Sequence, residues 1–224
     1  ADAGIDTPRL DARLIMAHGL QRDTGWLIGY PEAELTTAQS SHLEALISRR
    51  AAREPLAYIL GRKEFWSLEF KVSSATLIPR PDSETLVEAV LQRFADRDAA
   101  PRVLDLGTGS GCLLLSILHE LPRAVGIGVD RSAGALRVAE DNAERLGLAP
   151  RCRFFEGNWF SALDNSGVDP FDIVLTNPPY IADGEMVELA PEIIGFEPGS
   201  ALRAGADGLD CYREILDRLA AWLR

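Results

Sequence analysis

Four consecutive residues of this 224-residue chain form an array of hydrogen-bond acceptors, Asn177-Pro178-Pro179-Tyr180. Prolines have a fixed φ and no backbone N–H, so this pair presents rigid carbonyl oxygens, and Asn177 adds a side-chain carbonyl. An amide NH₂ is a poor nucleophile, so its N–H bonds must be held while its lone pair is aimed at a methyl donor. We predict that Asn177 and Pro178 accept these N–H bonds and that Tyr180 packs over the planar group.

A glycine-rich segment upstream, Asp105 to Gly111, lies where a predicted strand turns into a predicted helix. Glycines at such a turn let the backbone approach a ligand closely. Because Cys112 follows Gly111, the spacing is G-x-G-x-G, which disfavours the G-x-G-x-x-G pattern of a nicotinamide cofactor. Asp130 ends the next predicted strand, where its carboxylate can accept both hydroxyls of an adenosine ribose. The loop residues predicted to bind a ligand are Gly107, Thr108, Gly109, Ser110 and Gly111.

Asn158 and Trp159 follow the third predicted strand and complete a candidate nucleoside pocket. The amide of Asn158 can hydrogen-bond an adenine edge, and the ring of Trp159 can cover its face. Each feature also has a purely structural explanation, since the glycines can make a tight turn and Trp159 can belong to the core. Ligands of open α/β sheets bind at the carboxyl ends of the strands, so we favour one shared crevice.

The elements that must position these residues alternate between strand and helix from residue 102 onward, which is typical of a parallel α/β sheet. The predicted strands are 103–106, 125–129, 151–155 and 171–176, and the predicted helices are 112–120, 133–146 and 208–223. Pro81 opens another helix before them, with Leu86, Val87, Val90, Leu91 and Phe94 on its apolar face. No strand follows the last helix, so we expect one edge of the sheet to be unpaired and further C-terminal strands to be absent from this chain.

The domain organisation follows from the same patterns. Residues 1–63 show helical signals only, with helices beginning at Pro8 and after Thr37, and are predicted to form a small helical domain. Residues 64–76 are predicted to form a β-hairpin linker, because apolar and polar residues partly alternate. Residues 77–224 are assigned to the α/β domain.

Composition narrows the classes of function. The formal net charge of −11 repels a phosphate backbone and disfavours nucleic acid as a partner. The apolar stretches fall short of the ~20 residues of a membrane-spanning helix. The three cysteines are widely spaced without a histidine cluster, so neither a disulfide framework nor a metal site is predicted. With no secretory pattern at the N-terminus, the chain is expected to be cytoplasmic.

The sequence resembles the HemK/PrmC family of protein-glutamine N5-methyltransferases over essentially its whole length. Residues 77–81 match this family, and the part Ile78-Pro79-Arg80-Pro81 is much more particular to it, whereas Asn177 to Tyr180 is shared with enzymes that methylate amino groups of DNA and RNA. The other matching segments are Arg49-Arg50, 54–57, 64–65, 82–84, the glycine loop, 197–198, 201–202 and 207–209.

The resemblance implies a class I (Rossmann-like) S-adenosylmethionine-dependent methyltransferase domain with a small N-terminal helical domain that docks the substrate. The reaction it implies is methylation of the side-chain amide nitrogen (N5) of the glutamine in the Gly-Gly-Gln motif of peptide chain release factors, a modification in translation termination. S-adenosyl-L-methionine would be the cofactor and S-adenosyl-L-homocysteine the product.

The resemblance also assigns roles to residues. The glycine loop would contact the methionine end of the cofactor, Asp130 the ribose, and Asn158 and Trp159 the adenine. Residues Asn177, Pro178, Pro179 and Tyr180 would receive the glutamine, with Asn177 also bordering the cofactor. Arg80 and Glu84 would lie near the cofactor, although a role at the start of a helix explains Glu84 equally well. Two residues depart from the family pattern: Asn158 stands where Asp is usual, and Ser83 where Thr is usual.

Two other functions fit parts of the pattern. The same acceptor array suits an exocyclic NH₂ of adenine (N6), cytosine (N4) or guanine (N2), but a nucleic-acid enzyme needs a basic groove. The 23 basic and 34 acidic residues argue against one. A non-catalytic cofactor-binding module is the second alternative, and the intact Asn177 to Tyr180 array argues against it. We therefore expect a monomeric enzyme that acts on a protein and binds neither nucleic acid stably nor membranes.

Overall fold

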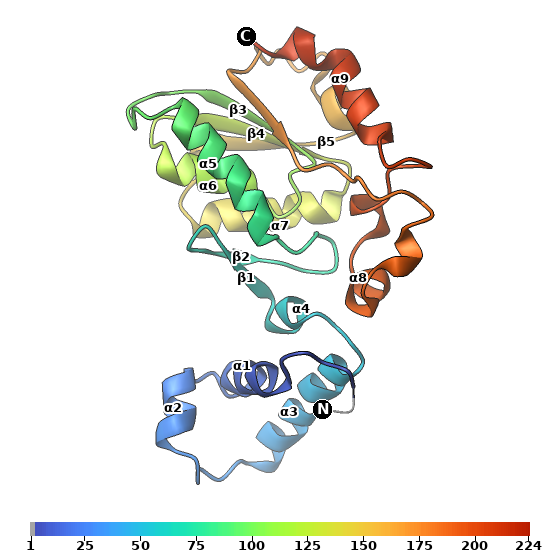
Figure 1. The fold of residues 1–224 in the computed structure, drawn as a ribbon. Helices are drawn as coiled ribbons and strands as arrows, with labels where there is room; N and C mark the ends of the chain where they lie inside the picture. The colour runs from blue at the N-terminus through green and yellow to red at the C-terminus, as the bar shows by residue number, and fades with distance from the viewer. Residues whose placement is uncertain (1–2) are drawn as a thin grey trace. The chain divides into compact units, whose positions relative to one another are not determined.

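The computed structural model describes residues 3–224, which divide into two compact units. The first unit holds the described residues up to Gly61 together with Ala190–Phe196. The second unit holds Arg62–Leu189 and Glu197–Arg224. This division differs from the predicted boundaries in two respects: the hairpin belongs to the second unit and is not a separate linker, and a short segment from the C-terminal half belongs to the first unit. Figure 1 labels most of the helices and strands along the chain.

The first unit is helical, and its small core contains Ile15, Leu46 and Ile59. Proline at the first position begins the first helix as expected. The third helix begins with a capping box, in which Thr36 and Gln39 exchange hydrogen bonds, so its N-cap lies one residue before the predicted Thr37. The helices of this unit are α1 (Pro8–Leu20), α2 (Thr24–Gly29), α3 (Thr37–Ala51), α4 (Leu56–Leu60) and α8 (Pro191–Phe196).

Ion pairs hold α8 within this unit. Glu192 accepts hydrogen bonds from Arg53 at 2.8 Å and from Arg50 at 3.4 Å, although it lies 142 positions after Arg50 in the sequence. Arg50 also donates to the buried Asp11 at 2.7 Å. These side chains are mostly withdrawn from solvent, so each charge needs its partner. Contacts over such sequence separations leave no local pattern, which is why the sequence did not reveal them.

The second unit is built on a parallel sheet with the strand order β5-β4-β3-β6. Its strands are β3 (Arg102–Leu106), β4 (Val125–Asp130), β5 (Cys152–Glu156) and β6 (Ile173–Thr176). Leu106 pairs with Val129 on one side and with Thr176 on the other. The chain passes from β3 to β4 and β5 and then returns to the opposite side of β3. The strand order therefore reverses at β3 and β6, which is where open α/β sheets bind ligands.

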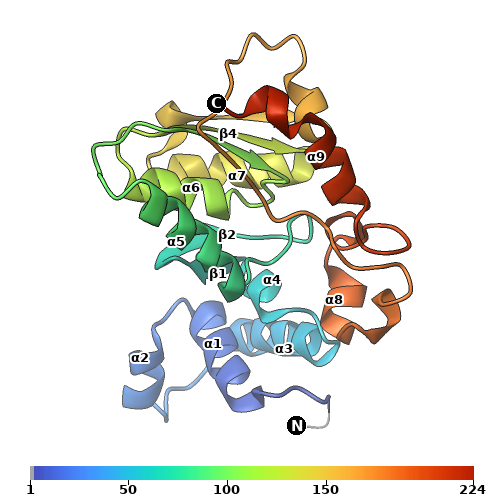
Figure 2. The same ribbon diagram turned by 45° about the horizontal axis from the view of Figure 1, so that its top comes forward.

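Helices cover both faces of this sheet, as Figure 2 shows. Val103 packs on the face covered by α5 (Glu84–Arg93) and α6 (Cys112–Glu120), whereas Leu104 packs on the face covered by α9 (Asp210–Trp222). Neighbouring residues of a strand point to opposite faces, so burial of both Val103 and Leu104 requires a layer of helices on each face. The helix α7 (Ala133–Arg145) follows β4, and an antiparallel hairpin of β1 (Arg62–Phe65) and β2 (Leu68–Lys71) precedes the sheet. Short 3₁₀ helices are η1 (Pro81–Ser83), η2 (Ala149–Arg151), η3 (Trp159–Leu163), η4 (Met186–Glu188) and η5 (Gly199–Ala201).

The packing of the last helix differs from expectation, whereas the sheet edge does not. Periodicity in the sequence predicts one apolar face on this helix, made of Leu209, Tyr212, Ile215, Leu216, Leu219 and Leu223. Ile215 is buried, whereas Leu209, Tyr212, Leu216 and Leu223 are exposed. The expectation for the sheet edge agrees with the structure: within residues 3–224 no strand follows α9, and β6 pairs with β3 alone. A single isolated bridge lies beside this edge. Phe171 N donates to Trp222 O and Arg224 N to Phe171 O, both at 2.9 Å, so the chain pairs in parallel just before β6 begins.

Candidate active site

The glycine loop follows β3 and is held by the neighbouring strand. The backbone N–H groups of Gly107 and Thr108 both donate to the carbonyl of Val129, at 2.8 and 2.9 Å. Gly107, Gly109 and Gly111 have φ of +75°, +57° and +80°, a conformation that glycine adopts at little cost. Gly111 does not line the crevice; it begins α6 where a Cβ would lie 3.0 Å from the Leu115 side chain. Its role in this structure is therefore to shape the turn.

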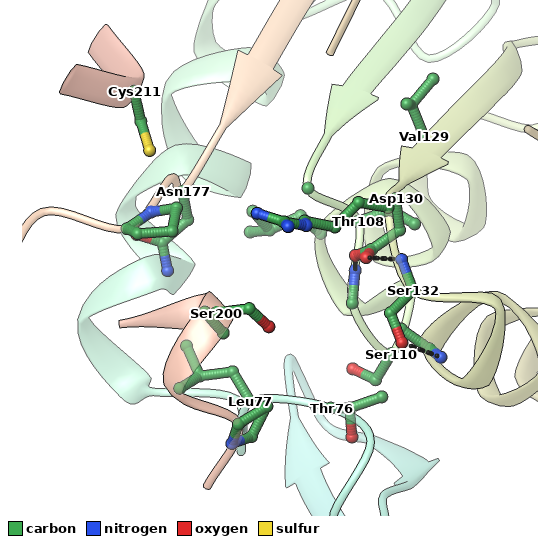
Figure 3. Close-up of a pocket in the computed structure, with 18 of the residues that line it drawn as sticks. Thr76, Leu77, Thr108, Ser110, Val129, Asp130, Ser132, Asn177, Ser200 and Cys211 are labelled. Carbon is green, nitrogen blue, oxygen red and sulfur yellow. Dashed lines mark hydrogen bonds between the residues drawn. The ribbon is translucent and has the colours of Figure 1, made fainter. Parts of the chain in front are cut away.

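A crevice opens at the carboxyl ends of the strands and brings the separate sequence motifs together (Figure 3). Asn177 lies across it from Thr108, Ser110 and Asp130. The predicted site residues that line it are Gly107, Thr108, Gly109, Ser110, Asp130, Asn158, Trp159, Asn177 and Pro179. The crevice thus joins residues from the ends of all four strands of the sheet.

Asp130 has the geometry of a diol-binding carboxylate. Its Oδ2 accepts a hydrogen bond from Gly109 N and its Oδ1 accepts one from Ser132 N, both at 2.9 Å. Each carboxylate oxygen keeps a second lone pair, so both can still accept a hydroxyl. The hydroxyl of Ser110 is buried in the crevice wall and has no hydrogen-bond partner among the described residues. Both observations fit a nucleoside cofactor with polar groups at its other end.

Asp105 supports the loop from behind. It is fully buried, does not line the crevice, and accepts a hydrogen bond from the Thr108 hydroxyl at 2.7 Å. Burial raises the pKa of Asp105 to about 7, because desolvation disfavours the charged carboxylate. The nearby charge of Asp130 raises it further, and the hydrogen bond from Thr108 opposes the shift. A neutral carboxyl here can hold Thr108 without a buried charge.

The Asn-Pro-Pro-Tyr segment begins directly after β6, where the hydroxyl of Thr176 donates to Leu106 O at 2.7 Å. Asn177 Nδ2 donates to the Ser83 hydroxyl at 3.3 Å. Pro178 is buried and Tyr180 is 60% exposed, and neither lines the crevice. The roles of the Pro178 carbonyl and of Tyr180 as a cover over the substrate therefore stay predictions.

A wall of the crevice comes from the segment before α5. Arg80 lines it and donates at 2.5 Å to Glu197, whose almost completely buried carboxylate also accepts from Ile78 N at 3.2 Å. Glu84 does not line the crevice; it is the first residue of α5, in agreement with the helix-start role that the sequence also allowed. Glu84 accepts from Trp66 N at 2.8 Å, so it anchors the hairpin to the start of α5.

The sequence interpretation missed several lining residues on the later part of the chain, among them Ser200, Arg203, Cys211 and Glu214. Cys211 and Glu214 are on α9, whose sequence shows only an amphipathic helix. The spacing of polar residues on such a helix does not tell which of them faces a ligand. Within residues 3–224, no group of His, Cys, Asp and Glu is arranged to hold a metal ion, and no helix is long and apolar enough to cross a membrane.

Comparison with known proteins assigns both parts of the chain. The family model of the PrmC N-terminal domain matches residues 1–61, and that of a methyltransferase domain matches residues 97–219. The release factor glutamine methyltransferase of Rhodospirillum rubrum is 44% identical over 221 residues, covering 99% of this chain and 66% of the relative. That of Bradyrhizobium diazoefficiens is 43% identical over 220 residues, covering 97% of this chain and 73% of the relative.

Among solved structures, the hMettl16 catalytic domain in complex with a 3'UTR hairpin has a TM-score of 0.57 and 18% identity, covering 78% of this chain and 62% of that one. At this identity the similarity concerns the fold alone. Together with the family match, the fold and the crevice define a class I S-adenosylmethionine-dependent methyltransferase domain. The chain belongs to the release factor glutamine methyltransferase family.

Proposed function

We propose that this chain transfers a methyl group from S-adenosylmethionine to the side-chain amide nitrogen of the glutamine in the Gly-Gly-Gln motif of peptide chain release factors. The observation that carries this proposal is that Asn177 and Asp130 line one crevice in a chain of this family. One residue is suited to hold an amide and the other to hold a ribose.

The residues of the crevice fit the cofactor. Asp130 would accept the ribose hydroxyls, and the glycine loop with the Ser110 hydroxyl would hold the methionine end. Asn158 and Trp159 would contact the adenine. When bound, S-adenosylmethionine supplies an electrophilic methyl group on a sulfonium.

The acceptor array would orient the substrate. Because Asn177 Nδ2 already donates to Ser83, its Oδ1 is the group left to accept an N–H of the incoming amide. The Pro178 carbonyl would accept the second N–H, and Tyr180 would exclude water. Holding both N–H bonds directs the nitrogen lone pair at the methyl carbon. No general base is required, since the proton leaves after the nitrogen has been alkylated.

We further propose that the chain acts as a monomer in the cytoplasm without stable binding of nucleic acid. The excess of 34 acidic over 23 basic residues supports the choice of a protein substrate over DNA or RNA. Phosphate recognition needs a cluster of positive charge, which this composition does not favour.

The test is to incubate the chain with labelled S-adenosylmethionine and a release factor, either wild type or with the Gly-Gly-Gln glutamine replaced by alanine. We expect label on the wild-type factor only, at that glutamine, as located by mass spectrometry of tryptic peptides. Total RNA and genomic DNA serve as competing substrates in parallel reactions. Label on nucleic acid in place of the release factor would refute the proposal.

A further inference from the structure

Glu214 on α9 lies at the end of the crevice that would hold the adenine. Its Oε1 accepts a hydrogen bond from Asn158 Nδ2 at 2.5 Å, and its Oε2 accepts one from Trp159 Nε1 at 3.1 Å. A single carboxylate therefore holds both residues assigned to the adenine. The two donors come from the segment after β5, more than fifty positions earlier in the sequence.

The chemistry of Glu214 decides how the Asn158 amide is turned. An ionised carboxylate only accepts hydrogen bonds, so the nitrogen of the Asn158 amide must face Glu214. The amide oxygen then faces away from Glu214. Adenine carries an exocyclic NH₂, which donates hydrogen bonds and therefore requires an acceptor. Fixing the amide in this orientation presents its oxygen, Asn158 Oδ1, as an acceptor for the NH₂ of adenine.

We propose that Glu214 is a positioning residue that fixes Asn158 as a hydrogen-bond acceptor for adenine and holds Trp159 in place. This inference rests on S-adenosylmethionine as the cofactor and is independent of which substrate receives the methyl group.

The identity of residue 158 agrees with this role. Residue 158 is an asparagine, whose side-chain NH₂ can donate to the carboxylate of Glu214. An aspartate in the same place would put a second carboxylate within 2.5 Å of Glu214, the distance now spanned by the amide hydrogen bond. Two ionised carboxylates so close repel each other and have no donor between them. Asn158 and Glu214 thus form a matched pair.

The backbone of Trp159 gives a second, independent reason for an anchor. Trp159 has a φ of +45°, a strained conformation for a bulky residue. Its ring lies where a Cβ on Gly107 would come within 3.4 Å, so it borders the glycine loop. A strained backbone persists only where the surroundings impose it, and the hydrogen bond to Glu214 is such a restraint.

The helix that carries Glu214 is itself fixed to the same segment. Phe160 stacks on Trp222 with ring centroids 6.0 Å apart, and Arg218 pairs with Asp164 at 2.6 Å. Ile215, next to Glu214, is buried against the sheet. Glu214, itself exposed, therefore projects from a helix that packs against the segment carrying Asn158 and Trp159.

A swap of hydrogen-bonding groups tests the proposal. The variants are Asn158→Asp, Glu214→Gln and the double substitution, with Asp217→Asn as a matched control that removes an exposed carboxylate of the same helix outside the crevice. In the double variant the glutamine amide can donate to the new aspartate and still accept from Trp159 Nε1, so the contact with residue 158 is restored with donor and acceptor exchanged, and the contact with Trp159 keeps its direction. Isothermal titration measures the Kd of S-adenosylhomocysteine and of S-inosylhomocysteine, whose base has a carbonyl in place of the exocyclic amino group.

We expect each single substitution to raise the Kd of S-adenosylhomocysteine about tenfold, as for loss of a hydrogen bond to a charged group. The double variant should return to within about threefold of wild type, and the control should not change. Glu214→Gln should also reduce the preference for the adenine compound, because the Asn158 amide can then turn over.

The outcomes distinguish failure of the role proposed for Glu214 from failure of the cofactor assignment. If wild type binds S-adenosylhomocysteine but the effects of the two substitutions add in the double variant, Glu214 does not position Asn158 and the proposal fails. An unchanged preference between the two compounds in Glu214→Gln would also overturn it. If wild type itself does not bind S-adenosylhomocysteine, the cofactor assignment is wrong and the role of Glu214 falls with it.

Discussion

Replacing Asn177 by alanine removes one acceptor from the proposed amide site and leaves the rest of the crevice in place. The hydrogen bond from its Nδ2 to Ser83 is 3.3 Å long, beyond the usual range for N–H···O, so little stability of the fold depends on it. A substrate N–H left without a partner in the closed site costs ~1–3 kcal/mol. This corresponds to a decrease in the transfer rate of about 5- to 150-fold.

The assay separates binding from transfer. Single-turnover rates with a saturating release factor report the transfer step, and titration with S-adenosylhomocysteine reports affinity for the cofactor. For Asn177→Ala we expect the slower transfer with an affinity within about twofold of wild type, because cofactor contacts come mainly from Asp130 and the glycine loop. Ser83→Ala is the matched control: it removes the same weak hydrogen bond but keeps the acceptor, so its transfer should decrease much less. Equal losses of affinity and rate in Asn177→Ala would refute the role assigned to this side chain.

Three further substitutions test the supporting structure. Asp130→Ala should weaken binding of S-adenosylhomocysteine in titrations more than it reduces turnover at saturating cofactor. A normal affinity in this variant would show that Asp130 does not bind the ribose. The pKa of Asp105 is raised to about 7. Between about pH 4 and pH 7 the folded chain therefore keeps a proton on Asp105 that the unfolded chain has lost. The free energy of unfolding consequently falls as the pH rises through this interval. In urea titrations at several pH values, Asp105→Asn should remove this loss, which amounts to at most about 4 kcal/mol at 1.36 kcal/mol per pKa unit; an unchanged slope would contradict a buried neutral carboxyl. Gly208→Ala should impair methyl transfer more than cofactor binding, because its φ is +75° and a Cβ would lie 2.4 Å from the carbonyl of Tyr180. Gly147→Ala is the control for backbone strain alone, because Gly147 has a φ of +70° and nothing lies within 4 Å of an added Cβ. If both substitutions reduced methyl transfer equally, the contact with Tyr180 would not be the cause of the loss.

The types of the main elements were predictable because they depend on local patterns. The helix predicted at 112–120 is α6 with the same bounds, and the strand predicted at 125–129 is β4 with one more residue. Apolar runs bounded by glycines and turn residues specify such elements wherever they fold. The glycine loop, Asp130 and Asn177 were predictable for the same reason, since each directly follows a strand and parallel strands place their carboxyl ends together.

Helix surfaces were predicted less well, and α9 shows why. Periodicity placed six apolar residues on one side of it, but only Ile215 is buried there. Which part of an amphipathic stripe packs depends on how the helix lies against its neighbours, and here the stacking of Trp222 on Phe160 takes part in that packing.

The sequence by itself determined the order of strands and helices, the turn that glycine makes possible after β3, and the residues that meet at the strand ends. Only the tertiary structure decided that α8 joins the helical unit through Glu192, that Glu84 anchors the hairpin, and that Glu214 holds Asn158 and Trp159. The physical reason is the distance along the chain over which each kind of interaction acts. Backbone propensity and periodicity act over a few neighbouring residues, whereas a carboxylate finds its donor by direction and distance in space, whatever the separation along the chain.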